Sequence, residues 1–216
     1  LMNLSQLSAF DIQGVRVPEH FIKWMKTSPL RSIPRIYHHQ RRLAPFFFNV
    51  LPAMSHLESL KCECLFGEPN QDVTWMIDLV RQCTQLTKLE VGIPHPQIPI
   101  LAAALLGLTN LVELRLYADE VWKMPPAFAT LHLPHLALLH TEMQISEADL
   151  SVFGEWLERH PRLEKLSVTF DRLEVFQQIY PVLYTCPVLN SLDVFFMEDT
   201  DSSYCLPSLP PTLRKL

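Results

Sequence analysis

Charged and aromatic side chains alternate with apolar residues in several short stretches of the chain. In ELRLY, Glu113, Arg115 and Tyr117 alternate with Leu114 and Leu116. Side chains of a β-strand point alternately to its two faces, so the polar set is predicted to face away from the core. Tyr and Arg often anchor protein interfaces, which favours a protein partner. The candidate partner-binding residues on this face are Arg35, Tyr37, Lys61, Glu63, Lys88, Glu90, Glu113, Arg115, Tyr117, His140, Glu142, Lys165, Asp193 and Phe195.

The same alternation has a simpler interpretation, in which the charges only keep a strand face solvated. The sequence also has none of the common signatures of catalysis: GxSxG, HExxH, a glycine-rich phosphate loop and a Rossmann fingerprint are all missing. Only five glycines occur in the chain. We therefore expect no enzyme activity and no cofactor, and we treat an unrecognised hydrolase as a remote alternative.

Three local groups of residues have the types, but not the spacing, of ligand sites. The three histidines of one stretch fit no standard zinc pattern, and the CxC pair has no second pair at a useful distance. A basic spot is too small for a nucleic-acid footprint. We expect no metal site at His132, His135, His140, Cys62 and Cys64, and no nucleic-acid site at His38, His39, Arg41 and Arg42.

The elements that position the alternating residues are visible in LLGLTNLVELRL, from Leu105 to Leu116. Leu114 and Leu116 are two residues apart and share one face of a strand. Leu105, Leu108 and Leu111 are three apart, which is typical of a helix end running into a turn. Such a unit buries its apolar face only against neighbours of the same shape.

The same spacing recurs along the whole sequence at intervals of 24 to 29 residues. Periods of about 20–29 residues with an LxxLxL pattern are typical of leucine-rich repeats. We therefore predict one domain, 1–216, of about eight to nine irregular repeats, with both ends apparently cut from something longer. The residues three before each strand leucine are Leu7, Ile33, Leu57, Leu86, Leu111, Leu136, Leu163, Leu189 and Leu213.

Helices are predicted between most of these strands. Amphipathic spacing indicates them over 18–25, 41–51, 70–80, 100–106, 146–157 and 173–183. Ser146 and Asp149 resemble a capping box, and Asn70 is a candidate N-cap. Pro125 and Pro126 leave room for only a turn or two of helix, and Pro181 predicts a kink or break.

Composition limits the class of protein. Apolar residues make up 48% and charged residues 19% of the chain, which is typical of a packed domain. The net charge of -5, with both signs interspersed, gives no reason to expect nucleic acid or an anionic membrane as partner. Five cysteines without a disulfide pattern favour a reducing interior, so we expect an intracellular protein of the cytoplasm or nucleus.

The stretches CPVLNSLDV, CTQLTKLEV and HPRLEKLSV resemble the repeats of F-box leucine-rich-repeat proteins, with irregular fungal members closest in texture. The resemblance implies an α/β leucine-rich-repeat solenoid of the ribonuclease-inhibitor-like type. Such a solenoid curves in a right-handed sense, with a parallel sheet on the concave side and helices on the convex side. The usual Asn or Cys after each strand is missing here, so we expect backbone groups or water to close the turns.

The resemblance also implies a function. Members of that family are typically substrate receptors of cullin-based ubiquitin ligases, in which the repeats hold the substrate and a separate F-box holds the ligase adaptor. We therefore expect a protein partner on the concave face, and adaptor binding only through a segment not in this chain. The alternative is a scaffold or regulatory protein of the ribonuclease-inhibitor kind with no ligase link.

Overall fold

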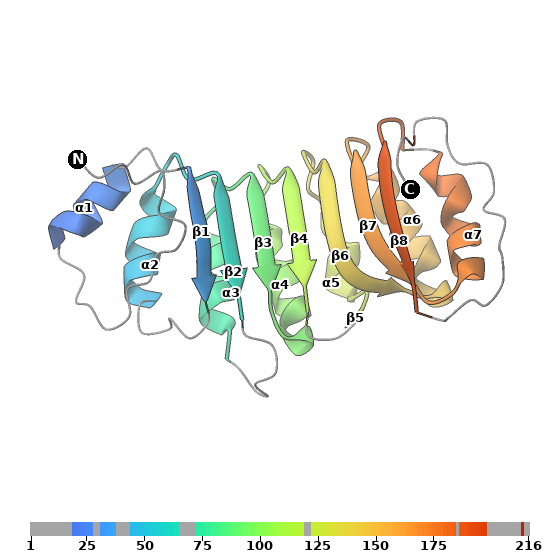
Figure 1. The fold of residues 1–216 in the computed structure, drawn as a ribbon, viewed down its shortest axis with the longest axis horizontal. Coiled ribbons are helices and arrows are strands. Elements are labelled where there is room, and N and C mark those ends of the chain that lie inside the picture. Colours follow the sequence, from blue (N-terminus) through green and yellow to red (C-terminus); the bar gives the residue numbers. More distant parts are fainter. Residues whose placement is uncertain are drawn as a thin grey trace.

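The computed structural model describes residues 19–27, 31–37, 44–64, 72–118, 122–184, 186–197 and 213. It is an α/β structure in which every strand pairing is parallel, and the sheet order is β1-β2-β3-β4-β6-β7-β8, with β5 pairing beside β6 (Figure 1). The predicted parallel α/β sheet is therefore confirmed. The strands are β1 (Ser32–Tyr37), β2 (Ser59–Glu63), β3 (Lys88–Gly92), β4 (Glu113–Tyr117), β5 (Trp122–Lys123), β6 (Leu138–Ile145), β7 (Lys165–Phe170) and β8 (Ser191–Phe196).

Helical segments lie between the successive strands of the path β1-β2-β3-β4-β6-β7-β8, and α3 to α6 lie one after another behind the sheet in Figure 1. None of the described helices is long and apolar enough to cross a lipid bilayer. The α-helices are α1 (Glu19–Thr27), α2 (Ala44–Val50), α3 (Thr74–Gln82), α4 (Ile98–Leu105), α5 (Pro126–Ala129), α6 (Leu150–Glu158) and α7 (Leu173–Leu183). The 3-10 turns are η3 (Leu51–Ala53), η4 (His95–Gln97) and η5 (Glu147–Asp149).

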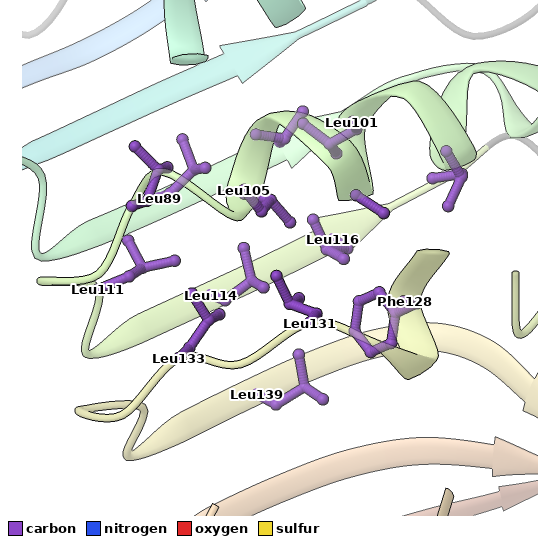
Figure 2. Close-up of a cluster of buried hydrophobic side chains, with 14 of the residues drawn as sticks. Leu89, Leu101, Leu105, Leu111, Leu114, Leu116, Phe128, Leu131, Leu133 and Leu139 are labelled. Carbon is purple, nitrogen blue, oxygen red and sulfur yellow. The ribbon is translucent and has the colours of Figure 1, made fainter. Parts of the chain in front are cut away.

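The core lies between the sheet and the helices. Leu114 of β4 pairs in register with Leu89 and Leu139 on the neighbouring strands, and it is 0% exposed. Leu105 of α4 and Phe128 of α5 belong to the same buried cluster (Figure 2). The row of buried residues that crosses the sheet at this level consists of Leu60, Leu89, Leu114, Leu139, Leu166 and Leu192.

The strands β2, β3, β4, β6, β7 and β8 begin with the same hydrogen-bonding arrangement. The carbonyl oxygen of Thr87 accepts the N–H groups of both Val112 (2.7 Å) and Glu113 (2.9 Å), so β4 is joined to β3 before the regular pairing starts. Six carbonyls accept two N–H groups from the following unit in this way. They belong to Arg31, Glu58, Thr87, Val112, Ala137 and Glu164.

The three-residue leucine spacing corresponds to a tight turn before each strand. The N–H of Leu111 donates to the carbonyl of Leu108 (3.0 Å), and the N–H of Leu108 donates to that of Leu105 (2.9 Å). Both turns bury their leucines completely. The same second turn is closed by the N–H groups of Leu57, Leu86, Leu136, Leu163 and Leu189.

Backbone groups also close the chain beyond the strands, where the sequence lacks the usual Asn or Cys. The N–H of Cys64 donates to the carbonyl of Gly92 (3.0 Å), and the N–H of Ile93 donates to that of Tyr117 (3.1 Å). The N–H of Asp171 reaches the carbonyl of Ile145 (3.2 Å) in the same manner. The expectation that backbone groups would replace a side-chain ladder is confirmed at these positions.

In the first described unit the buried row of the strand was predicted to begin at Ile36, but it begins three residues earlier, at Ile33. Ile33 pairs with Leu60 and Ile36 with Cys62, so Ile33 is itself the strand residue and not the turn residue before it. Pro34 and Arg35 together face the single residue Lys61, which makes a bulge. Proline has no N–H to donate to the pairing, so a bulge at this position is physically reasonable.

The helix predictions hold with small shifts. The expected capping box forms, because the N–H of Ser146 donates to the Asp149 carboxylate (3.1 Å). Pro125 is the N-cap and Pro126 the first residue of α5, which has only four residues, as expected. Of the kink or break predicted at Pro181, the break does not occur, since α7 continues through Pro181 to Leu183. Pro181 lies in the last turn, so its missing N–H removes a bond only where the helix is already ending.

Some predicted features lie outside the described residues. They include Pro18, the candidate N-cap Asn70, and the first predicted strand near Leu7. At the other end, residues 198–212 are likewise not described, and of the last predicted unit only Leu213 is described, without regular secondary structure.

His160 is a buried histidine of the helical side, at 2% exposed. Its Nδ1 lies 2.6 Å from the carbonyl oxygen of Trp156, and its Nε2 accepts the N–H of Leu133 (3.1 Å). Both contacts require a neutral ring that carries its proton on Nδ1. The ring also stacks on the Trp156 indole, with 4.0 Å between centroids. A histidine therefore takes a structural role between two units.

Leu114→Ala is expected to lower the free energy of unfolding by about 2–5 kcal/mol, because it leaves a cavity in the centre of the core. Glu113→Ala, on the next residue, is expected to cost at most about 1 kcal/mol, because it removes only a partly exposed ion pair with Lys88. Urea unfolding of both variants measures the difference. Equal losses would show that the strand faces are assigned wrongly.

The stability of the protein is expected to fall between about pH 6.5 and pH 4 because of His160. Burial lowers its pKa from 6.5 to about 4, and the neighbouring His132 and Arg159 contribute in the same direction. Protons then bind the unfolded chain more tightly, so stability is complete above the unfolded pKa and declines as the pH falls, by about 1.4 kcal/mol per unit. His160→Gln is expected to lose this part of the slope. The same slope in both proteins would contradict the assignment.

Candidate functional site

The side of the sheet that faces away from the helices carries the predicted polar set, and we call it the outer face. On β2, β4 and β6 its side chains alternate with buried ones, as the sequence predicts, whereas on β7 every residue after Lys165 is buried. Four of the candidates are exposed, namely Lys88, Lys165, Asp193 and Phe195, and eight are half-buried, namely Lys61, Glu63, Glu90, Glu113, Arg115, Tyr117, His140 and Glu142. Arg35 and Tyr37 lie on β1, but their side chains fall outside the described part of the chain.

Ion pairs between neighbouring strands organise the first half of the outer face. Lys61 pairs with Glu90, and Lys88 pairs with Glu113 at 3.1 Å. Each pair joins residues that are directly opposite in register. Opposite charges facing one another on adjacent strands stabilise the pairing modestly. The parallel register thus converts charges about 25 residues apart in sequence into direct neighbours.

An aromatic contact marks the middle of the outer face. The rings of Tyr117 and His140 lie 5.2 Å apart between centroids. Burial lowers the pKa of His140, and the adjacent Arg115 acts in the same direction, while Glu142 opposes it. His140 is therefore held in its neutral form near pH 7. Tyr117, Arg115 and neutral His140 together give a partly apolar centre within a charged surface.

A hollow of about 340 Å³ opens on the outer face at the ends of β2, β3 and β4. It lies over Gly92, which pairs in register with Glu63 on one side and Tyr117 on the other. Because glycine has no side chain, the surface is lower there than at its neighbours. The hollow, which we call the Gly92 hollow, is lined by Lys61, Cys62, Glu63, Glu90, Gly92, Tyr117, Ala118 and Glu142.

Sequence reasoning did not single out Gly92, although a signal was present. Lys88 and Glu90 face outward, so the alternation of β3 also places Gly92, two residues after Glu90, on the outer face. A glycine inside a strand often marks a close approach or a missing side chain. The sequence could therefore have predicted a low point of the outer face at Gly92, but it could not have predicted which residues surround it.

Ser167 and Thr169 of β7 are among the further outer-face residues that sequence reasoning missed. Ser167 is 4% exposed and pairs in register with His140 and Asp193. These are the residue types of a hydrolytic triad, but Ser167 lies between the other two, and its buried Oγ has no hydrogen-bond partner. In a working triad the histidine lies in the middle and bonds to both partners. The arrangement therefore lacks the geometry for that chemistry.

The three histidines considered as metal ligands lie in three different places. His132 packs against His160 with 5.8 Å between ring centroids, and His135 contacts Arg162 at 3.0 Å. His140 lies on the outer face. Their separation shows that their closeness in sequence does not make them a cluster in space.

The cysteine side chains have structural surroundings. The thiol of Cys64 donates to the carbonyl of Gly92 (3.0 Å), and Cys62 is 1% exposed in the strand position that leucine takes elsewhere. Burial raises the pKa of the Cys83 thiol to about 12. A protonated, buried thiol is a poor nucleophile and a poor metal ligand. These residues therefore behave as small apolar side chains.

A second, wider groove of about 590 Å³ runs along the edge of the sheet where the strands begin. Most of its polar side chains bind one another or the backbone. Asn110 donates to the carbonyl of Thr84 (3.3 Å), and Arg162 contacts His135. Since these polar groups are already engaged, the Gly92 hollow is the more informative candidate.

Comparison of the chain with known protein families and with characterised proteins gives no match. The function of the outer face has to be argued from its geometry and charge.

Proposed function

We propose that this chain is a leucine-rich-repeat solenoid whose outer face binds a protein partner. The observation that carries the proposal is the division of the sheet into two unlike faces. One face is a continuous apolar core under the helices, and the other is a half-buried mixture of charges and aromatic rings. Arg and Tyr at the centre of such a surface are typical anchors of protein interfaces.

The repeat interpretation is supported by the recurrence of one hydrogen-bonding plan. Every unit from β2 onward in the sheet path starts with two N–H groups on one carbonyl of the preceding unit. Parallel strands joined by helices curve, because a helix is wider than the spacing of strands. In this proposal the outer face is the concave side, which suits a rounded partner surface.

The more specific proposal is that these are the substrate-recognition repeats of an F-box type ubiquitin-ligase receptor, working in the cytoplasm or nucleus. It depends on the resemblance of the repeats to that family. The structure is compatible with a division of labour, since α2 to α7 each bury an apolar stripe. The alternative, a scaffold of the ribonuclease-inhibitor kind, uses the same face without a ligase.

Replacing Arg115 and Tyr117 by Ala is expected to reduce capture of a partner by at least about tenfold, because each anchor contributes about 1–2 kcal/mol or more. The measurement is quantitative capture from cell extract with wild-type and variant protein on the same support. The thermal midpoint should change little, because both side chains lie on the outer face.

The matched control replaces the same two residue types on the helical side, Arg81→Ala with Tyr184→Ala. Both residues are exposed there. A partner that is lost with the outer-face variant and kept with the control supports the proposal. A partner that is lost only with the control would place the binding surface on the helices and overturn the proposal.

The ligase proposal makes a separate prediction. Purified cullin adaptor is expected not to bind residues 1–216, because the packed helices leave no free F-box surface among the described residues. Size-exclusion chromatography of the mixed proteins measures this, with a known F-box protein as positive control. Adaptor binding by this chain alone would contradict the division of labour, while the proposal for the outer face would stand.

A further inference from the structure

We propose that His160 makes the joint between α5 and α6 sensitive to acid, so that protonation of its ring releases the segment 126–133 while the sheet stays folded. The joint is the contact of this segment with α6, on the helical side of the molecule. It is therefore independent of the partner of the outer face. One hydrogen bond between two units, the shortness of α5 and the aromatic rings buried at the joint carry the proposal.

The hydrogen bond replaces a contact that other units make within themselves. The N–H of Leu108 closes its turn on the carbonyl of Leu105 in the same unit (2.9 Å). At the corresponding position the N–H of Leu133 donates to Nε2 of His160, which belongs to the next unit (3.1 Å). Because α5 has only four residues, this unit closes its turn on its neighbour. The donors that close the turn within their own unit also include Met54, Cys83, His160 and Cys186.

The bond to Leu133 exists only while His160 is neutral. Nδ1 of the ring lies 2.6 Å from the carbonyl oxygen of Trp156, so the ring proton is on Nδ1 and Nε2 is left as the acceptor. A second proton would lie on Nε2 and point at the N–H of Leu133. Two donors would then face each other where a donor now meets an acceptor, so protonation removes the bond between the units.

The surroundings of the ring do not compensate a positive charge. Burial lowers the pKa of His160 to about 4, and the bond to the carbonyl of Trp156 opposes this shift only in part. His132, from the segment after α5, and Arg159, on α6 itself, lower the pKa further. Among the described residues no carboxylate acts on the ring, and α7, which also packs against α6, contributes no charged group. A protonated His160 would be a buried cation without a partner.

The other contacts that hold the segment 126–133 to α6 are weaker. Arg159 donates to the carbonyl of Ala129 at an exposed position, where water competes for both groups. The Phe128 ring stacks on Trp156 with 5.8 Å between centroids. A helix of four residues is not stable by itself, so α5 keeps its form only while it is packed.

The sheet has bonds of its own that the opening does not break. Ala137 and Leu138 both donate to the carbonyl of Val112, and β5 pairs with β6. These contacts flank the segment on its two sides in the sequence. They therefore mark the limits of the opening and keep it local.

The aromatic rings at the joint change their surroundings on opening. Phe128 and Trp156 are 0% exposed, and Phe128 also packs on Trp122 with 5.9 Å between centroids. The indole N–H groups of Trp122 and Trp156 are buried without a hydrogen-bond partner among the described residues. A buried donor without a partner costs free energy, and water removes that cost once it has access. Acid thus uncovers an apolar surface that is closed at neutral pH.

The measurement is amide hydrogen exchange of the whole chain, followed residue by residue by NMR and corrected for the intrinsic exchange rate. The opening constant of the Leu133 amide is expected to rise about 40-fold from pH 6.5 to pH 4.5, because the ring has an ordinary pKa when open and a pKa of about 4 when closed. The Leu108 amide, at the same place one unit earlier, is the internal control. At pH 4.5 its opening constant should be at least about tenfold smaller than that of Leu133.

Low concentrations of urea distinguish the local opening from unfolding of the whole chain. The urea dependence of an opening constant scales with the surface that the opening exposes. The Leu133 amide should depend little on urea at pH 4.5. The Glu113 amide, which donates to the carbonyl of Thr87 at the start of β4 (2.9 Å), should show the full dependence of global unfolding.

His160→Gln is expected to abolish the acid response at Leu133. The carboxamide can accept the N–H of Leu133 and donate to the carbonyl of Trp156, but it does not titrate. The matched control is His132→Gln, which removes the neighbouring exposed histidine and should retain the response. If His160→Gln does not fold, the comparison of Leu133 with Leu108 in the unsubstituted chain still decides.

Equal opening constants at Leu133 and Leu108 at pH 4.5 would overturn the proposal. Equal urea dependence at Leu133 and Glu113 would do the same, because the segment would then open only when the whole protein unfolds. An unchanged acid response in His160→Gln would show that another group titrates. All three measurements use the chain without a partner, so the proposed function of the outer face stands or fails separately.

Discussion

The structure depends on one backbone interaction repeated along the sheet, in which a carbonyl at the start of one strand accepts two N–H groups from the next unit. Thr87 accepts from Val112 and Glu113, and Val112 in turn accepts from Ala137 and Leu138. This pairing needs no particular side chain, so the sequence is free to vary around it. It also fixes the register of neighbouring strands before their side chains meet.

A fixed register has opposite consequences on the two faces of the sheet. Towards the helices it aligns Leu89, Leu114 and Leu139 in one fully buried row, where each leucine packs against its neighbours. On the outer face it aligns Lys61 with Glu90, which forms an ion pair across strands. Stability is concentrated on the first face, because burial of apolar area contributes far more than partly exposed ion pairs. The outer face therefore contributes little to stability, and its residue types are less constrained by packing.

The arrangement also explains how an irregular sequence keeps a regular sheet. Cys62 takes a leucine position, and His160 takes a turn position as a neutral ring bonded to Leu133 and Trp156. Pro34 is absorbed in a bulge opposite Lys61. Each of these irregular residues is accommodated by its neighbours in the adjacent unit, so its effect on the sheet stays local.

The sequence by itself determined the parallel strands, the turns before most of them and the buried or outward direction of most residues on β2, β3, β4 and β6, because these follow from spacing within a single unit. It could not determine that Ile33 is a strand residue, that Lys61 pairs with Glu90, or that His160 is neutral. Nor could it reveal the walls of the hollow over Gly92. Those features depend on which residue of another strand or helix lies opposite. A bulge of one residue changes that partner while leaving the local pattern intact, so only the tertiary structure decided them.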